Sequence, residues 1–507
     1  MSDPIKWKIM QDPVHGVIEL DPVALKIIDT SEFQRMRFIK QLGCMDYVYP
    51  GATHTRFAHS IGVYHLACKM IDALRKSIPV DQTGENDIRM TDWEEECVRI
   101  AALCHDLGHG PFCHIYEEMC REKYGNTWNH RYLSCSMVKR IFKKDDIKKE
   151  MKSKDTKKSI RLIMKLIMGK EISKMSDSEK RRAYMFQIIK NVESSVDVDK
   201  WDYLCRDALH CGLNERFLTD RAILGARVVL TSGPGELEVH QIGYPEKDAL
   251  MFYNMFQTRY TLYRYIYRHR VGIGMNLMIK DIFYDSDSEL KKVRSNAFPI
   301  EETTKIPDTD ADLDRYIDCN DDEEKMNQYV ELTDDIISRI RYIRLQKSNE
   351  PGLPFANAIN TLKRIDTRDF YKMHCEMHLK RGTTLTAAEE ELKKCTQKLQ
   401  EEDENYIKKY VKNVLICFNL GSKDEDPMKN MIFYNKRCCA EGSECLRGDK
   451  LDTIKLPYLP TNNFSDYYIR IYVKKRPIPH NIESVIRVLS DEYRNEYEPR
   501  QDDGDAE

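Results

Sequence analysis

The stretch at residues 91–112, TDWEEECVRIAALCHDLGHGPF, decides the fold of this chain. It opens with a helix-capping signal, continues as an apolar helical stripe, and ends in glycines and a proline that stop a helix. His105 and Asp106 are therefore predicted in the last helical turn, next to the hydrophobic core. Most His-Asp pairs lie on surfaces, but a buried pair is costly unless it binds a metal or takes part in catalysis.

Two more stretches complete a predicted metal site. RFAHS, residues 56–60, contains His59, and DVDKWDY, residues 197–203, contains Asp199. Imidazole and carboxylate ligands on three converging helices suit a divalent cation that activates water. These ligand types accept iron, zinc, manganese, cobalt or magnesium, so the sequence leaves the metal open.

Length and composition indicate a soluble globular protein. The chain has 507 residues, of which 41% are apolar and 32% charged, enough for roughly two to four domains. Its net charge of −3 gives no overall attraction to nucleic acid or membranes. No apolar run approaches the roughly 20 residues of a membrane helix, and Met1 to Asp12 show no secretory signal.

Cysteine usage indicates a reducing, intracellular compartment, either nuclear or cytoplasmic. The 16 cysteines include no Cys-x-x-Cys pair. A structural zinc site at Cys438, Cys439 and Cys445 is a less favoured alternative, because the paired spacing of zinc ligands is missing. The run KKRP at 474–477 is a weak match to a nuclear signal.

Helical spacing dominates residues 13–275 and predicts a mainly α fold, a helical bundle with a smaller mixed α+β lobe near the C-terminus. Strand signals are few, with a hairpin from 227–231 and 236–242 and a further strand at 467–473. The predicted division is 1–290 for the catalytic domain with an N-terminal regulatory segment, 291–430 for a helical extension, 431–490 for the small lobe, and 491–507 for a disordered acidic tail.

Two segments are strongly charged. Residues 139–182 contain 17 Lys and Arg against 7 Asp and Glu, which is typical of a solvated helical surface. Contact with single-stranded nucleic acid is the alternative, although aromatic residues for base stacking are missing there. Residues 301–325 are acidic and rich in turn formers, and we expect them to form an exposed excursion.

The three metal-site stretches together resemble the HD-domain deoxynucleoside triphosphate triphosphohydrolases, most closely the vertebrate type that also carries a SAM domain. The resemblance covers residues 5–275 well and extends loosely to about 475, so we expect no SAM domain in this chain. It implies an HD helical bundle that hydrolyses a deoxynucleoside triphosphate (dNTP) to deoxynucleoside and inorganic triphosphate. It also associates the chain with dNTP catabolism and antiviral defence.

The resemblance assigns roles around the α-phosphate. It makes His59, His105, Asp106 and Asp199 the metal ligands, and it places His109, His114 and His130 along the phosphates, where they assist proton transfer. Many relatives carry a glutamate where this chain has Arg131. We expect Glu117 to take part of that role.

The resemblance also implies a substrate site. Arg56, Lys200 and Arg259 would bind phosphates, which independently need cations in fixed geometry. Tyr267 would leave no room for a 2′-hydroxyl, and Tyr263 and Arg268 depart from the family's His and Gln. Without the resemblance, we would interpret the stripe from Arg259 to Arg268 as a packed helix of basic and aromatic residues. The remaining substrate residues implied are Gln41 and Asp207 at the 3′-hydroxyl, Tyr203 at the sugar, and Leu42 near the sugar and base.

Regulation by nucleotides is a further implication of the resemblance. Binding of GTP, together with a dNTP, would activate the enzyme and assemble dimers into a homotetramer. An Asp is a sensible partner for guanine, whose N1–H and N2–H form a donor pair. Pro245 stands where the family has an arginine. The regulatory residues implied are Asp29, Gln34 and Arg37 at the guanine, Lys8 and Ile9 beside them, and Arg221, Lys247 and Arg270 for the second nucleotide.

Two other function classes stay open. One is a different HD reaction, that of a 5′-nucleotidase or phosphodiesterase, which product analysis would distinguish. The other is a non-catalytic nucleotide sensor or nucleic-acid-binding protein, which the basic segment 139–182 would favour. Salt-sensitive binding of single strands without turnover would support that second class.

Overall fold

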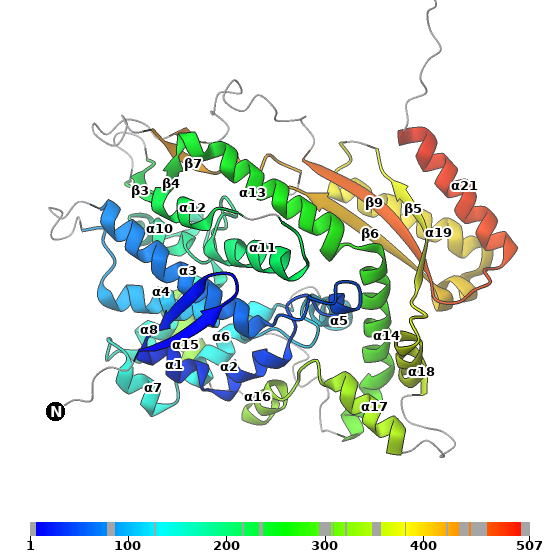
Figure 1. The fold of residues 1–507 in the computed structure, drawn as a ribbon, viewed down its shortest axis with the longest axis horizontal. Helices are drawn as coiled ribbons and strands as arrows, with labels where there is room; N and C mark the ends of the chain where they lie inside the picture. The colour runs from blue at the N-terminus through cyan, green and yellow to red at the C-terminus, as the bar shows by residue number, and fades with distance from the viewer. Residues whose placement is uncertain are drawn as a thin grey trace, which may run out of the picture.

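The chain forms a mainly helical body with small mixed sheets toward its C-terminal part, as predicted (Figure 1). A computed structural model describes residues 7–78, 87–125, 128–214, 217–232, 237–293, 306–307, 309–319, 322–346, 356–380, 382–421, 424–435, 446–447 and 464–497. The cysteines considered for zinc, Cys438, Cys439 and Cys445, lie outside the described residues, as does the tail beyond Tyr497.

Three long helices bring the predicted metal ligands together. They are α3 (Arg56–Ser77), α4 (Asp92–Cys104) and α11 (Val198–His210), and α3 packs against both of the others. The predicted capping signal of α4 is confirmed, because the Thr91 side chain accepts from the Glu94 backbone N–H and the Glu94 side chain accepts from Thr91 in return.

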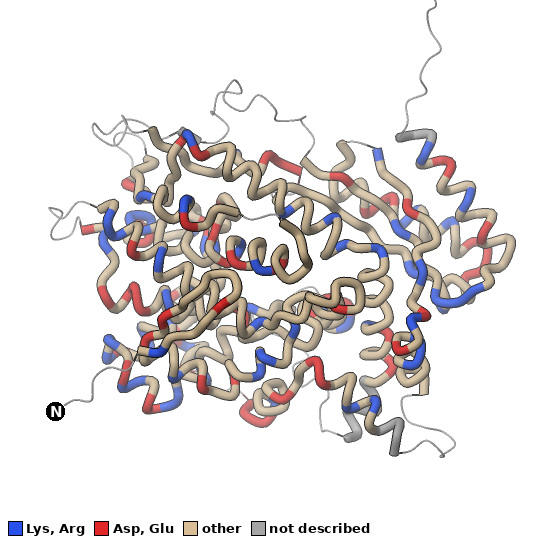
Figure 2. Tube along the Cα trace, viewed as in Figure 1, with Lys and Arg blue, Asp and Glu red and all other residues tan. Residues whose placement is uncertain are grey.

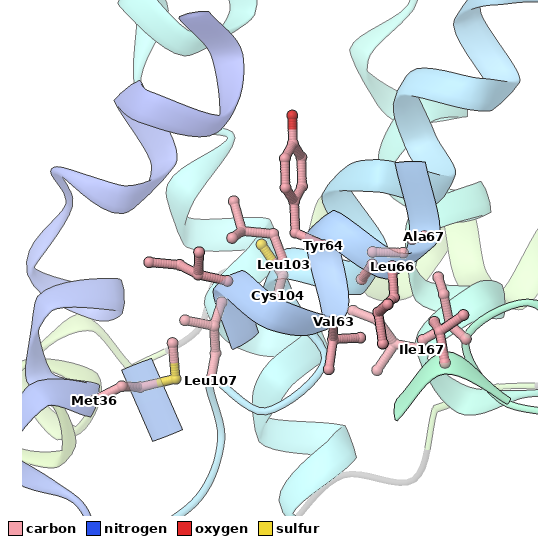
Figure 3. Close-up of a cluster of buried hydrophobic side chains, with 14 of the residues drawn as sticks. Met36, Val63, Tyr64, Leu66, Ala67, Leu103, Cys104, Leu107 and Ile167 are labelled. Atoms are coloured by element: carbon pink, nitrogen blue, oxygen red, sulfur yellow. The ribbon is translucent and has the colours of Figure 1, made fainter. Parts of the chain in front are cut away.

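A single large hydrophobic core holds these helices at fixed positions (Figure 3). Val63 and Leu66 of α3, Leu103 of α4 and Ile167 of α8 (Thr156–Met168) are at most 2% exposed and belong to one buried cluster. Burial of each such aliphatic side chain contributes about 1.5–3 kcal/mol. The ends of α3, α4 and α11 can therefore present polar groups without moving relative to one another.

The other helices continue the body along the chain. Between α13 and α14, a π-helical turn covers Tyr263–Tyr267, and π-helical turns often occur at functional sites. The remaining bounds are α1 Pro22–Ile28, α2 Ser31–Gln34, α5 His114–Tyr124, α6 His130–Ile141, α7 Asp145–Glu150, α9 Asp177–Lys180, α10 Ala183–Gln187, α12 Thr219–Gly225, α13 Ala249–Leu262, α14 Arg270–Val293, α15 Asp310–Asp318, α16 Glu323–Val330, α17 Ile336–Gln346, α18 Ala356–Asp366, α19 Leu385–Tyr410 and α21 His480–Tyr497.

The described strands form three small sheets. The predicted hairpin and the predicted C-terminal strand are confirmed, with the second hairpin strand displaced toward the C-terminus. The sheets are an antiparallel pair β1 (Lys8–Asp12) and β2 (Gly16–Leu20), a sheet ordered β3 (Arg227–Leu230), β4 (His240–Pro245), β7 (Ile432–Tyr434) and β8 (Leu446–Arg447), and a sheet ordered β5 (Lys372–His378), β9 (Ser465–Val473) and β6 (Val411–Asn419).

The three-stranded sheet lies between the helix α19 of the C-terminal part and the helical body. Ile469 and Ile471 of β9 pack in one cluster with Leu399 of α19. Tyr472 of β9 belongs instead to a cluster with Ile273 of α14. Alternating residues of one strand therefore bury two faces, as β geometry requires, and the lobe is fixed next to the π-helical turn.

The basic segment 139–182 is largely paired with acids in the described part of the chain. Arg161 donates to Asp314 at 2.8 Å, Lys157 pairs with Asp318 at 2.6 Å, and Lys165 pairs with Asp310. These acids lie on α15, whose buried Leu313 anchors it against α8. The predicted exposed excursion is therefore wrong for residues 310–318. Composition alone does not show that a basic residue pairs with an acid about 150 residues away in the sequence.

Both charges are spread along the described chain. Figure 2 shows basic and acidic residues interspersed over the molecule in this view, in keeping with a net charge of −3. Among the helices that the structure describes, none combines the length and the apolar run that crossing a membrane requires.

Candidate metal centre

The four predicted ligands converge at one point. The His59 Nε2 atom lies 3.2 Å from Asp199 Oδ1 and 3.5 Å from Asp106 Oδ2. The His105 Nε2 atom lies 3.4 Å from Asp106 Oδ1 and 3.6 Å from Asp199 Oδ1. Ligand atoms of His59, His105 and Asp106 all lie within 4.8 Å of one another and could hold one metal ion.

Both imidazoles are oriented as metal ligands are. The Nδ1–H group of His59 donates to Asp202 at 2.7 Å, and that of His105 donates to the Ala102 carbonyl at 2.8 Å. Their Nε2 atoms are buried and make no hydrogen bond. Fixing Nδ1–H in this way leaves the Nε2 lone pair pointing into the cluster, which is the usual support for a metal-bound histidine. The residues therefore fit a divalent cation.

The electrostatics of the cluster also favour a cation. Burial disfavours a charged His59 imidazole, but the nearby carboxylates of Asp199 and Asp202 outweigh burial and raise the pKa of His59 to about 10. Burial likewise opposes ionisation of Asp106, yet His105 and Arg56 hold the pKa of that carboxyl well below its usual range. Without a bound ion, the carboxylates thus favour a proton on His59, so the site attracts positive charge.

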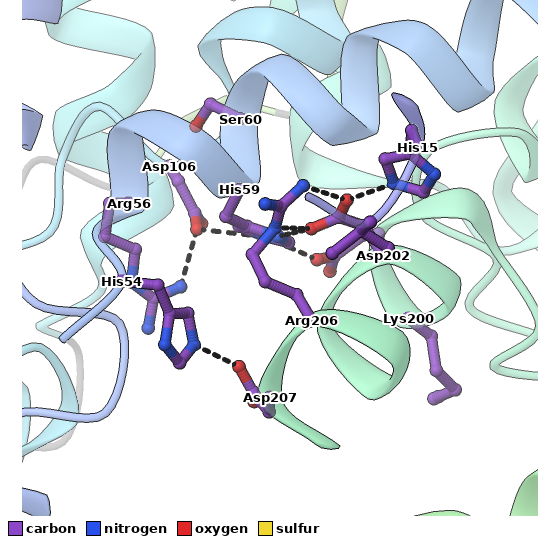
Figure 4. A network of polar contacts seen from close by, with 12 residues as sticks. His15, His54, Arg56, His59, Ser60, Asp106, Lys200, Asp202, Arg206 and Asp207 are labelled. Carbon is purple, nitrogen blue, oxygen red and sulfur yellow. Dashed lines mark hydrogen bonds and ion pairs between the residues drawn. The ribbon is translucent and has the colours of Figure 1, made fainter. Parts of the chain in front are cut away.

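A buried network behind His59 supports the site (Figure 4). The Asp202 carboxylate accepts from His59, from His15 at 2.6 Å and from Arg206 at 2.9 Å. Arg206 also donates to Asp12 at 2.8 Å. None of these residues was predicted from the sequence to take part in the site. Asp202 is three positions from Asp199 on α11, and this shared helical face was a usable signal.

Helices α3 and α11 pack closely at Gly62. A Cβ atom at this position would lie 1.9 Å from Asp202 Oδ1 and 2.4 Å from a terminal nitrogen of Arg206. Both atoms are fixed by the network behind His59. The position therefore requires glycine for close packing.

We expect Asp202→Asn to lower metal affinity roughly 10- to 100-fold, the usual effect of removing a partner that orients a ligating histidine. The amide keeps the shape of the carboxylate but loses its charge and one acceptor for His59, His15 and Arg206. Competition with a chelating dye measures the affinity. Asp92→Asn, on an 87% exposed side chain of α4, is the matched control. Equal affinities in the two variants would contradict the role of Asp202.

The three predicted catalytic histidines lie beside the metal ligands. His109 Nε2 is 3.3 Å from Asp106 Oδ1, and the His109 ring stacks on His130 with centroids 3.9 Å apart. His130 Nδ1–H donates to Glu117 at 2.9 Å, while the side chain of His114 is 70% exposed and 3.5 Å from Glu117. Glu117 thus contacts two of the three histidines, as expected from the Arg131 departure.

A cavity of about 430 Å³ opens on this cluster, a size suited to a small-molecule ligand. Two predicted phosphate contacts do not line it. Lys200 donates to the Ser195 carbonyl, and Arg259 donates to the Asn419 carbonyl at 2.6 Å and stacks over Tyr263. The predicted residues that do line the cavity are Gln41, Leu42, Arg56, Asp106, His109, His114, His130, Asp199, Tyr203, Asp207, Tyr263, Tyr267 and Arg268.

Two of the residues at the cavity form a hydrogen-bonded group with a residue behind them. The Tyr267 hydroxyl donates to Asp207 Oδ2 at 2.6 Å, and His54 Nε2–H donates to Asp207 Oδ1 at 2.7 Å. His54 in turn stacks on His210 with ring centroids 4.4 Å apart. These contacts fix the Tyr267 ring at one wall of the cavity. The sequence analysis missed His54, which lies just before the stretch RFAHS.

The predicted regulatory residues lie at the surface in separate places. Arg37 donates to Gln34 at 2.8 Å, close to the exposed Asp29. Arg221 and Lys247 line one cavity together with Pro245, and Arg270 lines another. Lys8 and Ile9 are exposed on β1. In this single chain, the residues implied for the second nucleotide are not brought into one site.

Comparison with known proteins agrees with this geometry. Residues 56–207 match the family model of the HD domain. The chain is similar to the deoxynucleoside triphosphate triphosphohydrolase SAMHD1 of Homo sapiens (32% identity, covering 92% of this chain and 70% of that protein) and of Mus musculus (31%, 92% and 69%). It is also similar to the SAMHD1 homolog of Dictyostelium discoideum (30%, 95% and 80%). With a buried His/Asp cluster inside the matched segment, the chain belongs to the SAMHD1 family of HD-domain phosphohydrolases.

Proposed function

We propose that the chain hydrolyses dNTPs to deoxynucleosides and inorganic triphosphate. The observation that carries this proposal is that Asp106 and Asp199 of the ligand cluster line a cavity of about 430 Å³ that Tyr267 and Asp207 also line. One ligand spanning the cavity would place its phosphates at the cluster and its sugar at the tyrosine. The names of the relatives state the same reaction for those proteins.

The side chains divide the work of the proposed reaction. His59, His105, Asp106 and Asp199 would hold a divalent cation, which when bound supplies a Lewis acid for the phosphoryl oxygens. Arg56 donates to Asp106 at 2.6 Å and lines the cavity, so its charge is oriented toward the phosphates.

Proton transfer falls to the histidines beside the metal ligands. His109 and His130 are stacked, and Glu117 fixes the orientation of His130. His114 lies at the open side of the cavity, where its mostly exposed imidazole can exchange protons with solvent. We assign His109 and His130 to the phosphates and the attacking water, and His114 to the leaving oxygen.

The proposal is tested by turnover of dGTP and dATP with magnesium or manganese, with and without GTP, and with products separated by ion exchange. Deoxynucleoside plus triphosphate supports it. Release of inorganic phosphate from a monophosphate, or cleavage of a phosphodiester, would favour the other HD reactions. No turnover with either metal, combined with salt-sensitive binding of single strands, would favour a nucleic-acid-binding protein.

Tyr267→Ala should relax the preference for deoxyribose. The ring is fixed by its bond to Asp207, and removing it opens room for a 2′-hydroxyl. We expect the ratio of kcat/KM for dATP over ATP to fall roughly 10- to 100-fold. Tyr265→Ala on the same π-helical turn is the matched control, because that side chain is 56% exposed. An unchanged ratio in Tyr267→Ala would remove this residue from sugar selection.

We also propose activation by GTP and a dNTP with assembly into a tetramer. The pair formed by Gln34 and Arg37, with Asp29 exposed beside it, offers acceptors and a cation suited to a guanine nucleotide. A nucleotide that binds only the assembled form shifts the equilibrium toward it. Sedimentation velocity with and without GTP and a dNTP measures that shift, and Asp29→Ala should abolish it.

A further inference from the structure

Asp334 lies in the connector between α16 and α17, outside the segment that matches the HD domain. Its Oδ1 atom accepts from the Phe112 backbone N–H at 2.7 Å, and its Oδ2 atom accepts from the Lys40 backbone N–H at 2.9 Å. We propose that Asp334 is a positioning residue that holds two loops of the cavity in register. This inference rests on the hydrolysis proposed above.

The first loop carries Gln41. Residues 40 and 55 form an isolated antiparallel bridge, and the Gln41 N–H donates to the His54 carbonyl at 2.9 Å. The segment leads directly into α3, where Arg56 N–H donates to the Ile39 carbonyl at 3.0 Å. By accepting from the N–H of Lys40, Asp334 sets how far this loop reaches into the cavity, and thus where Gln41 lies.

The second loop carries His114. Phe112 and Cys113 have φ angles of 55° and 56°, in the left-handed region that side chains other than glycine rarely adopt. Such a conformation persists only where its surroundings hold it. α5 begins immediately afterwards with His114, so this turn fixes the point at which the imidazole enters the cavity.

Contacts between the two loops make them one unit. The Cys113 thiol donates to the Lys40 carbonyl at 2.9 Å, and Arg56 Nε–H donates to the Cys113 sulfur at 3.1 Å. The Asp334 carboxylate also binds both loops, with one oxygen for each loop. Loss of either oxygen therefore removes the bond that ties one of the two loops to the connector.

The connector that carries Asp334 is itself well anchored. Its own backbone N–H donates to the Phe38 carbonyl at 3.1 Å. The buried Arg35 guanidinium donates to the carbonyls of Val330 at the end of α16 and Leu332 in the connector. It also donates to those of Leu107 and His109 beside the metal ligands. The backbone that carries the Asp334 carboxylate is therefore held in place.

A carboxylate is specifically suited to this position. Both of its partners are backbone N–H groups, so two acceptors are needed, and an asparagine offers only one. The amide nitrogen of asparagine would face the other N–H group. Burial raises the pKa of Asp334 to about 7, and its two backbone hydrogen bonds only partly oppose this, so burial works against the charged form that offers both acceptors.

The test compares Asp334→Asn with Asp335→Asn, an exposed neighbour for which no side-chain hydrogen bond is found in the described chain. The measurements are kcat and KM for dGTP, the preference for dGTP over its 3′-deoxy analogue, and bound metal. We expect Asp334→Asn to lower kcat about tenfold to a hundredfold, because small misplacements of reacting groups have effects of that size. Metal content should stay unchanged, and the preference for a 3′-hydroxyl, which the resemblance assigns to Gln41 and Asp207, should fall because Gln41 is displaced.

The outcomes are separable. Wild-type protein without dNTP turnover overturns the proposed function and this inference with it. Active wild type with Asp334→Asn equal to Asp335→Asn in kcat and in 3′-hydroxyl preference overturns the inference alone. If Asp334→Asn does not fold, Asp334→Glu decides: a folded, metal-loaded variant with lowered kcat and preference supports positioning. Failure of both to fold makes Asp334 a folding residue and also overturns it.

Discussion

Asp106→Asn should lower turnover by on the order of a thousandfold or more, the effect of losing several kcal/mol of transition-state stabilisation from a bound cation. Asp106 lies at the centre of the cluster: its oxygens face His59, His105 and His109, and Arg56 donates to it at 2.6 Å. Asparagine keeps the shape but removes the negative charge that a cation requires. Bound metal should fall in parallel with turnover.

The measurement pairs steady-state turnover of dGTP with metal content by mass spectrometry. Asp72→Asn is the matched control, since it removes a carboxylate from α3, the helix of His59, at a side chain that is 60% exposed. Retention of both metal and turnover in Asp106→Asn would remove this residue from the metal site. Retention of metal with loss of turnover would instead limit its role to orienting Arg56 and His109.

Gly62→Ala should destabilise the protein, although helix propensity alone predicts the opposite. Alanine is favoured over glycine inside a helix by about 1 kcal/mol. At this position, however, the added methyl group meets Asp202 and Arg206, whose buried ion pair would have to break or move. Breaking such a pair costs roughly 3–5 kcal/mol, so we expect a net loss of roughly 2–4 kcal/mol.

Denaturant unfolding in the presence and absence of the metal measures this loss. Lys76→Ala introduces an alanine at an exposed position of the same helix and should leave stability nearly unchanged. The sign is decisive: a more stable Gly62→Ala protein would mean that the network around Asp202 adjusts freely. Weakened metal binding in the variant would place the effect at His59 rather than in the helix.

Residues 491–497 of the predicted disordered tail form the last part of helix α21, so that expectation is corrected for them. The sequence was most informative where chemistry and local structure coincide. His105 and Asp106 stand at the end of an apolar helix, so their burial follows from periodicity, and a buried imidazole and carboxylate need a cation or a reaction. The capping signal at Thr91 and the hairpin at 227–231 are likewise local patterns, and the structure contains both.

Contacts between distant segments could not be predicted. The pairing of α15 with the basic segment joins residues about 150 positions apart and depends on which helix faces are left uncovered. Lys200 and Arg259 have the right type and spacing for phosphates, but in this structure they donate to Ser195 and Asn419 and do not line the cavity. Spacing along a helix gives the side chain's direction relative to that helix, and not the neighbour it will meet.

The network behind His59 bears on whether the HD domain is structurally independent of the rest of the chain. Segment 56–207 contains all four predicted ligands, yet His15 and Asp12, which partner Asp202 and Arg206, lie in the N-terminal hairpin before it. A protein cut to residues 56–207 would keep the four ligands. Asp202 and Arg206 would stay buried but lose partners, and each broken ion pair would lower the stability by roughly 3–5 kcal/mol. The hairpin of residues 8–20 thus belongs to the same structural unit as the metal ligands, although none of its residues is a predicted ligand.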